Sequence, residues 1–217
     1  AAFLPRFFKT GKGEYGEGDQ FIGVVVPNLR IVAKKHFDAD FDTFRELLAS
    51  PYHEYRLTAL LALTYRYAKF KDLASREACV NFYVSQVDAI NNWDLVDLSC
   101  YKILGHWLFD KDKQLLYDWA KENHLWKQRI AMISCMHFVK QGEFKDALAI
   151  ADLLQHHPHD LIHKAVGWIL REIGKEDEQL LIDYLTPRYK EMPRTMLRYA
   201  IERFEEGKRK AFLHSKV

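Results

Sequence analysis

Apolar residues recur at three- and four-residue spacing along almost the whole chain after residue 26. Pro27 suits a first helical turn, and Leu29, Val32, Ala33 and Phe37 then form one apolar stripe. The same spacing predicts further helices at 41–49, 52–69, 73–90, 92–108, 112–123, 125–140, 143–156, 160–174, 177–190 and 194–205. Because no segment alternates apolar and polar residues over the length of a strand, we expect an all-α fold.

Four of these expected helices share a basic residue followed by an apolar run. The shared positions are Arg56, Arg129, Lys164 and Arg198, with 35 residues from 129 to 164 and 34 from 164 to 198. The 73 residues from 56 to 129 leave room for one more copy near residue 92. A period in the middle thirties with two helices per unit is typical of HEAT-like repeats. We therefore expect an α-α superhelix whose second helices present basic residues along a concave face.

One segment differs in composition from the helical part. Residues 11–23 hold five of the ten glycines, which predicts a loop. No strand precedes this loop and no GK[ST] follows it, so it does not match a phosphate-binding loop. We expect one repeat domain over residues 1–217, with an N-terminal segment at 1–26, helical repeats at 27–205 and a solvated basic tail at 206–217.

Composition and charge limit the possible classes of protein. The chain has 217 residues, 48% of them hydrophobic, and carries no apolar run long enough to span a membrane. Three separated cysteines without a CxxC pair favour a reducing, cytoplasmic location. Because the formal net charge is only +2, any nucleic-acid-binding surface must be local.

The copy near residue 92 places acidic residues where the other copies place basic ones. Trp93 and Asp97 lie four residues apart, so both project from one helix face and could serve a site. Taken alone, the segment favours a structural interpretation: Asn91 or Asn92 caps the helix, Trp93 packs, and Asp94 and Asp97 favour its first turn.

Two other segments carry candidate chemistry with structural alternatives. Arg129 could bind an anion or be a solvated arginine, and Trp168 could belong to a site or to the core. Gly167, directly before Trp168, clears space for something to approach the helix. The histidines of segment 156–159 have no cysteine or carboxylate at ligand spacing, so we expect no metal.

Four segments together resemble the DNA alkylation repair (AlkD-like) family. Residues 23–30 are similar to its G-V-x-x-P-x-L-R segment, and residues 93–97 resemble the W-D-x-V-D signature. Residues 125–131 resemble L-W-x-x-R-x-A, and residues 164–172 resemble K-A-[IV]-G-W-x-L-R-E. The resemblance extends from about residue 20 to 205, with the four segments in the family's order.

The resemblance implies a HEAT-like fold and a glycosylase that removes N3- and N7-alkylated purines from duplex DNA. Because no lysine is singled out as a Schiff-base former, we expect a monofunctional enzyme that leaves an abasic site, and we expect no cofactor. The resemblance places Asp97 at the catalytic carboxylate, Arg129 at an essential arginine near the DNA backbone, and Trp93 and Trp168 at active-site tryptophans. The sequence departs from the family at Asn92, where a second aromatic residue often precedes the tryptophan. The sequence also begins short of the family's first helix.

These side-chain types suit the expected reaction. An alkylated purine cation is already a good leaving group, so positive charge develops mainly on the deoxyribose as the N-glycosidic bond breaks. A carboxylate at Asp97 can stabilise this charge and orient the attacking water. We expect DNA contacts from basic residues of the second helices: Arg56, Arg129, Lys164, Arg171, Arg194 and Arg198.

Two other functions remain open at this point. A relative could keep the scaffold and recognise DNA structure without cleavage, although the presence of both Trp93 and Asp97 favours an enzyme. A HEAT-like protein-interaction scaffold would fit the near-neutral charge and predicts no salt-sensitive DNA affinity. We expect a monomer in each case.

Overall fold

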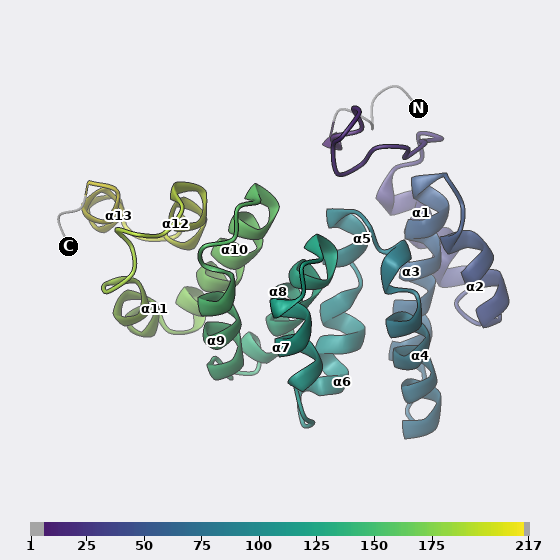
Figure 1. Ribbon diagram of the computed structural model, residues 1–217. Coiled ribbons are helices and arrows are strands. Elements are labelled where there is room, and N and C mark those ends of the chain that lie inside the picture. Colours follow the sequence, from purple (N-terminus) through teal and green to yellow (C-terminus); the bar gives the residue numbers. More distant parts are fainter. Residues whose placement is uncertain (1–6, 215–217) are drawn as a thin grey trace. The chain divides into compact units, whose positions relative to one another are not determined.

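The computed structural model describes residues 7–214, which form helices joined by turns and loops (Figure 1). Within this range, the only β-type pairing is an isolated parallel bridge between Gln20 and Tyr52. The all-α fold expected from the sequence is therefore confirmed. The chain divides into two compact units between Trp107 and Leu108. Each unit is described by itself, and the single repeat domain expected over the whole chain stays a prediction.

Unit 1 begins with an irregular segment, residues 7–25, here called the N-terminal strap. Its longer helices are α1 (Val26–Lys35), α2 (Phe41–Leu48), α3 (His53–Lys69) and α4 (Leu73–Ser85). Shorter turns follow: η2 (Val87–Ala89), α5 (Trp93–Asp97), the π-helical turn η3 (Tyr101–Gly105) and α6 (His106–Leu108).

Helix α3 is the centre of unit 1, and it packs against α1, α2, α4 and α5. Its side chains Leu57, Leu60 and Leu61 are at most 1% exposed. The single helix predicted at 92–108 is broken after Asp97, and a π-helical turn separates it from α6. The sequence does not reveal this break, because apolar residues keep the helical spacing through it.

Unit 2 contains α7 (Gln114–Lys121), α8 (Leu125–Val139), α9 (Lys145–Leu154), α10 (Asp160–Glu176), α11 (Glu178–Leu185), α12 (Arg194–Ala200) and α13 (Glu206–Leu213). Helix α7 packs against α8 and α9 packs against α10, and helices α8, α10 and α12 pack against one another in that order. The basic residues that defined the period, Arg129, Lys164 and Arg198, lie on these three helices. The predicted repetition of helix pairs is therefore present in unit 2.

The C-terminal segment differs from the solvated tail expected at 206–217. Residues 206–213 form helix α13, whose Phe212 is 1% exposed and packs edge-on against Tyr189 and beside Phe204. The apolar period did not predict this helix, because the segment is mostly basic. Phe212 is its one buried side chain, so the segment has no apolar stripe. No helix in residues 7–214 is long and apolar enough to cross a membrane.

Candidate functional site

The short helix α5 carries Trp93 and Asp97 on one face. Both side chains are half-buried, so each retains access to solvent. Asn92 caps the helix, with its side-chain oxygen accepting a hydrogen bond of 2.8 Å from the Trp93 backbone N–H. The structural interpretation was therefore right about the cap, and Trp93 and Asp97 are each partly accessible to solvent.

A buried hydroxyl pair lies close to Asp97. The Tyr83 hydroxyl is 3.1 Å from the Ser99 hydroxyl, which donates to the Leu95 carbonyl at 2.5 Å. Burial raises the pKa of Tyr83, and the negative charge of Asp97 contributes to the same rise. The tyrosine therefore remains a neutral hydrogen-bonding group beneath α5.

Asp94 is directed into unit 1 and makes a contact that its sequence position did not reveal. Only 5% of the residue is exposed, and its Oδ2 lies 2.8 Å from Nε2 of His53 on α3. Its other oxygen is buried without a hydrogen-bond partner among the described residues. The sequence analysis assigned Asp94 only to the helix start, whereas the structure shows it joining α5 to α3.

The second ring nitrogen of His53 faces the N-terminal strap. Its Nδ1 is 3.4 Å from Oδ2 of Asp19, and the other oxygen of Asp19 pairs with Arg56. Burial lowers the pKa of His53, but hydrogen bonds and charge from Asp19 and Asp94 outweigh it and raise the pKa to about 9. The buried group therefore contains a protonated imidazole between two carboxylates.

Asp19 stays ionised in this environment. Burial raises the pKa of its carboxyl, but hydrogen bonds from His53, Asn92 and Arg56, together with the charge of Arg56, lower it overall. The side chains of Asp19 and Arg56 are each only 6% exposed. We call Asp19, His53, Arg56 and Asp94 the buried charge cluster.

Aromatic rings cover the buried charge cluster on the strap side. Phe8 stacks on Trp93 with ring centroids 5.3 Å apart, and it also lies 4.7 Å from the His53 ring. Phe21 stacks on His53 at 5.1 Å. Rings in such contacts exclude water from the polar groups beneath them, so the charges of the cluster act at low dielectric.

Arg56 was expected to face DNA, because it shares the basic position of the repeat. In the structure it is buried instead. It is 5% exposed, and its guanidinium donates to the side chains of Asp19 and Asn91. The neighbouring Glu54, 1% exposed, accepts hydrogen bonds from the backbone N–H groups of residues 22–24 at 2.8 to 3.3 Å. The start of α3 thus binds the strap with a basic and an acidic residue.

In unit 2, Arg129 is 4% exposed and donates from Nη1 to the backbone carbonyl of Leu161. Trp168 is half-buried on α10. The space that the sequence analysis expected at Gly167 is filled by α12, because a β-carbon on Gly167 would lie 2.5 Å from the Met196 carbonyl oxygen. The glycine therefore serves helix packing in unit 2.

A polar hollow of about 380 Å³ lies between α10 and α12. Lys164, Arg198 and the Thr195 side chain line it together with Asp160, Tyr199 and Glu202. Lys164 pairs with Asp160 at 2.6 Å, and Arg198 is exposed. Of the other predicted contacts, Arg171 pairs with Glu202, and Arg194 donates to the Leu213 carbonyl at 3.0 Å.

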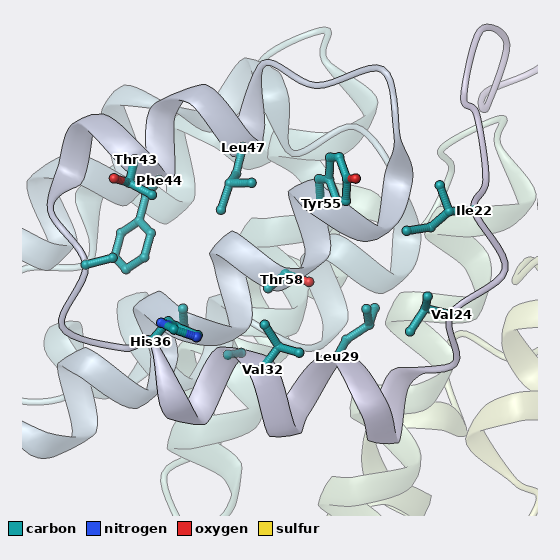
Figure 2. A pocket seen from close by; sticks show the side chains of 13 residues that line it. Ile22, Val24, Leu29, Val32, His36, Thr43, Phe44, Leu47, Tyr55 and Thr58 are labelled. Carbon is teal, nitrogen blue, oxygen red and sulfur yellow. The ribbon is translucent and has the colours of Figure 1, made fainter.

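A second hollow in unit 1 is apolar. The hollow has a volume of about 410 Å³. Figure 2 shows its lining, which is formed by α1, α2, α3 and the end of the strap. Ile22, Leu29, Val32 and Leu47 line it, and His36 stands at one end. Because no group of charged side chains converges there, it offers no acid–base chemistry.

The histidines near residue 157 are used by the backbone of unit 2. His159 Nδ1 accepts from the Leu161 N–H at 3.1 Å, and His157 Nδ1 accepts from the His159 N–H at 3.0 Å. The Nε2 of His157 lies 2.9 Å from the side-chain oxygen of Gln128. Among residues 7–214, no cluster of histidine, cysteine or carboxylate side chains could hold a metal ion.

Asp19, His53 and Glu54 were not among the residues predicted from the sequence. The available signal was polar residues at the start of α3, directly before a run that contains the core residues Leu57 and Leu60. Charged residues on a buried face need partners, so this pattern indicates a buried network. Sequence alone could not identify Asp19 as the partner.

Comparisons with known proteins agree with the fold. The family model described as DNA alkylation repair enzyme matches residues 1–204. A solved structure, described as a predicted DNA alkylation repair enzyme from Enterococcus faecalis, is similar with a TM-score of 0.71 and 14% sequence identity. That alignment covers 95% of each chain. A search of curated proteins found no match.

Proposed function

Because the chain belongs to the DNA alkylation repair enzyme family, we propose that it is a monofunctional glycosylase acting on N3- and N7-alkylated purines in duplex DNA. Asp97 is the proposed catalytic carboxylate and Trp93 its aromatic neighbour. The observation that carries this proposal is the placement of both residues on one face of α5, half-buried and open to solvent.

The proposed reaction is hydrolysis of the bond between the deoxyribose C1′ and the purine nitrogen. The bonding electron pair leaves with the cationic base, which becomes neutral, and positive charge develops on the sugar. The Asp97 carboxylate stabilises this charge and accepts a proton from water as its oxygen bonds to C1′. The products are the free alkylated base, an abasic site and a proton released to solvent.

Trp93 can contact the sugar-phosphate backbone beside the lesion and limit the access of bulk water. Its indole is already held on one face by Phe8, which leaves it less rotational freedom. A pre-oriented aromatic face costs little entropy on binding and can add a cation–π interaction with the charged sugar. Recognition through sugar charge and backbone contact does not require a closed base pocket, so bulky adducts fit the proposal.

Unit 2 supplies the proposed phosphate contacts. Lys164 and Arg198 line the polar hollow, and the Thr195 hydroxyl adds a neutral donor for a phosphate oxygen. A phosphate would compete with Asp160 for Lys164, so DNA binding exchanges one ion pair for another. Arg129 and Trp168 remain proposed site residues on the family resemblance, and Arg171 and Arg194 remain proposed DNA contacts as basic residues of the second helices.

Release of 7-methylguanine and 3-methyladenine from methylated duplex DNA tests the proposal. We expect wild-type protein to release both bases, and Asp97→Asn to lower the single-turnover rate about a hundredfold or more while DNA binding persists. Asp88→Asn is the matched control, since Asp88 is exposed on η2 in the same unit. Equal rates for wild type and Asp97→Asn would contradict the proposed role of Asp97.

The same assay separates the enzyme from a DNA-binding protein without activity. If wild type released neither base but bound DNA in a salt-sensitive manner, the chain would be a repair-family scaffold that recognises DNA. If it also failed to bind DNA, a protein-interaction function would be favoured.

A further inference from the structure

Asp19 in the N-terminal strap is hydrogen-bonded to the start of α5. Its Oδ2 accepts from the Asn92 side-chain amide at 3.0 Å. The Asn92 side-chain oxygen in turn accepts from the Trp93 N–H at 2.8 Å. Two consecutive hydrogen bonds therefore connect a residue of the strap with the first residue of α5.

A second connection runs from Asp19 through His53. The imidazole contacts Asp19 at 3.4 Å with one nitrogen and Asp94 at 2.8 Å with the other. Asp94 is the second residue of α5 and directly follows Trp93. Both of the first two residues of this helix are thus held, through different side chains, by the same carboxylate.

The strap also contacts α5 through its beginning, because it doubles back on itself. The Gly16 N–H donates to the Lys9 carbonyl at 2.7 Å, and a β-carbon on Gly16 would lie 2.8 Å from that oxygen. This turn brings Phe8 onto the Trp93 ring while Asp19 reaches the polar side of α5. The strap therefore holds both the ring of Trp93 and the backbone from which it projects.

Helix α5 depends on such support because it contains only five residues, Trp93–Asp97. An isolated helix of this length is unstable, since nucleation costs more than so few hydrogen bonds return. The π-helical turn that begins at Tyr101 interrupts the regular helix shortly after Asp97. The contacts made at the start of α5 therefore help to orient Asp97, together with the buried side chains of Leu95 and Val96.

Asp19 also balances the buried charges. Asp19 and Asp94 face two cations, the protonated His53 and Arg56, while the nearby Glu54 is occupied by backbone N–H groups of the strap. Removing the negative charge of Asp19 leaves Arg56 without its paired carboxylate and His53 with Asp94 as its remaining acidic contact. The imidazole is then held on one side only, so its contact with Asp94 no longer ties α5 to the strap.

We propose that Asp19 is a positioning residue, which fixes α5 through Asn92, His53 and Asp94 so that Trp93 and Asp97 keep their orientation. The N-terminal strap then contributes to the proposed reactive centre of unit 1 through its contacts with α5. The catalytic consequence rests on the proposed function, whereas the anchoring of α5 does not.

Amide hydrogen exchange of the full chain tests the anchoring directly. In Asp19→Asn we expect peptides covering residues 92–97 to exchange about tenfold faster than in wild type, with α8 and α10 unchanged. Glu17→Gln is the matched control, because Glu17 lies in the same strap and its exposed carboxylate bonds only within it. Unchanged exchange at 92–97 in Asp19→Asn would overturn the proposal.

The rate of base release then tests the positioning role. We expect Asp19→Asn to lower the single-turnover release of 7-methylguanine about tenfold or more while the DNA Kd changes less than about twofold, because orientation affects the reactive step. Faster exchange at 92–97 with an unchanged rate would reject positioning. An inactive wild type would contradict the proposed function, and the exchange result would still decide whether Asp19 anchors α5.

A conservative variant keeps the test decisive if Asp19→Asn does not fold. Asp19→Glu retains the charge and adds one methylene group, so we expect it to fold and to show smaller changes in exchange and rate than Asp19→Asn. If Asp19→Asn does not fold, faster exchange at 92–97 together with slower base release in Asp19→Glu would support the proposal. Wild-type exchange at 92–97 in a folded Asp19→Glu, or faster exchange with a wild-type rate, would overturn it.

Discussion

Gly167 and Met196 determine how closely α10 approaches α12. A β-carbon on Gly167 would lie 2.5 Å from the Met196 carbonyl oxygen and equally close to Cβ of Tyr199. Both neighbours are backbone or backbone-proximal atoms, which cannot rotate away. The close approach brings Lys164 on α10 and Arg198 on α12 to the same polar hollow.

Replacing Gly167 with alanine should therefore destabilise the protein. In an unconstrained helix this change would stabilise by up to about 1 kcal/mol. Here we expect a loss of about 1–3 kcal/mol, because the new methyl group forces α10 and α12 apart. Urea unfolding followed by circular dichroism measures the change, with exposed Glu176→Ala on the same helix as control. A more stable Gly167→Ala protein would contradict the packing described.

The raised pKa of His53 predicts that the free energy of unfolding falls in the alkaline range. The pKa of His53 is raised from 6.5 to about 9 in the folded protein, so the protonated form favours folding. This contribution is fully present below pH 6.5 and is lost as the pH rises through about 9. Its size is at most about 3 kcal/mol.

Comparison of wild type with His53→Gln between pH 6 and 10 checks this expectation, since the variant cannot titrate at this position. The difference in unfolding free energy should shrink as the pH rises. Exposed His36→Gln should follow the wild-type curve. A pH-independent difference would mean that His53 is not protonated in the folded protein.

Arg56 and Arg198 should respond to truncation in opposite ways. Arg56 is buried against Asp19, so Arg56→Ala removes one of the two cations beside this buried carboxylate and should destabilise by about 3–5 kcal/mol. Arg198 is exposed, so Arg198→Ala should leave stability unchanged and reduce the slope of log K against log salt for DNA by about one. Thermal unfolding and DNA titrations at several salt concentrations separate the two effects.

Glu54 should hold the second half of the strap. It accepts three backbone N–H groups, and Glu54→Gln removes the charge that strengthens these bonds. We expect a loss of about 1.5–3 kcal/mol. Faster tryptic cleavage at Lys9 and Lys12 would report the release of the strap, with exposed Glu46→Gln on α2 as the control. Equal cleavage of wild type and Glu54→Gln would show that other contacts hold the strap.

The positions of most helices followed from the sequence because their buried faces repeat with the helical period. This period was enough to predict the start of α3, the start of α8 and the pairing of α9 with α10. The break after Asp97 was not predictable, because the π-helical turn keeps apolar residues such as Ile103 and Leu104 on the core side. Periodicity records which residues are buried and is insensitive to a local change in hydrogen-bond pattern.

The candidate site could be predicted only in part for a related reason. Trp93 and Asp97 are neighbours within one helix, so their spacing determines their shared face. The contact between Asp19 and Asn92 joins residues 73 positions apart and depends on the conformation of a glycine-rich loop. Arg56 matched the repeat of basic residues, yet burial and the charge of Asp19 determine its environment.

The π-helical turn at Tyr101–Gly105 sets a rotational phase. It contains one residue more than a regular turn, so side chains after Gly105 are rotated by roughly 100° relative to an uninterrupted α-helix. Deleting a single residue in this turn would restore α-helical winding and rotate His106 away from the Tyr67 hydroxyl, which lies 2.8 Å from its ring nitrogen. The extra residue therefore sets the rotation of α6 relative to α5. With it, Asp94 of α5 contacts His53 and His106 of α6 contacts Tyr67.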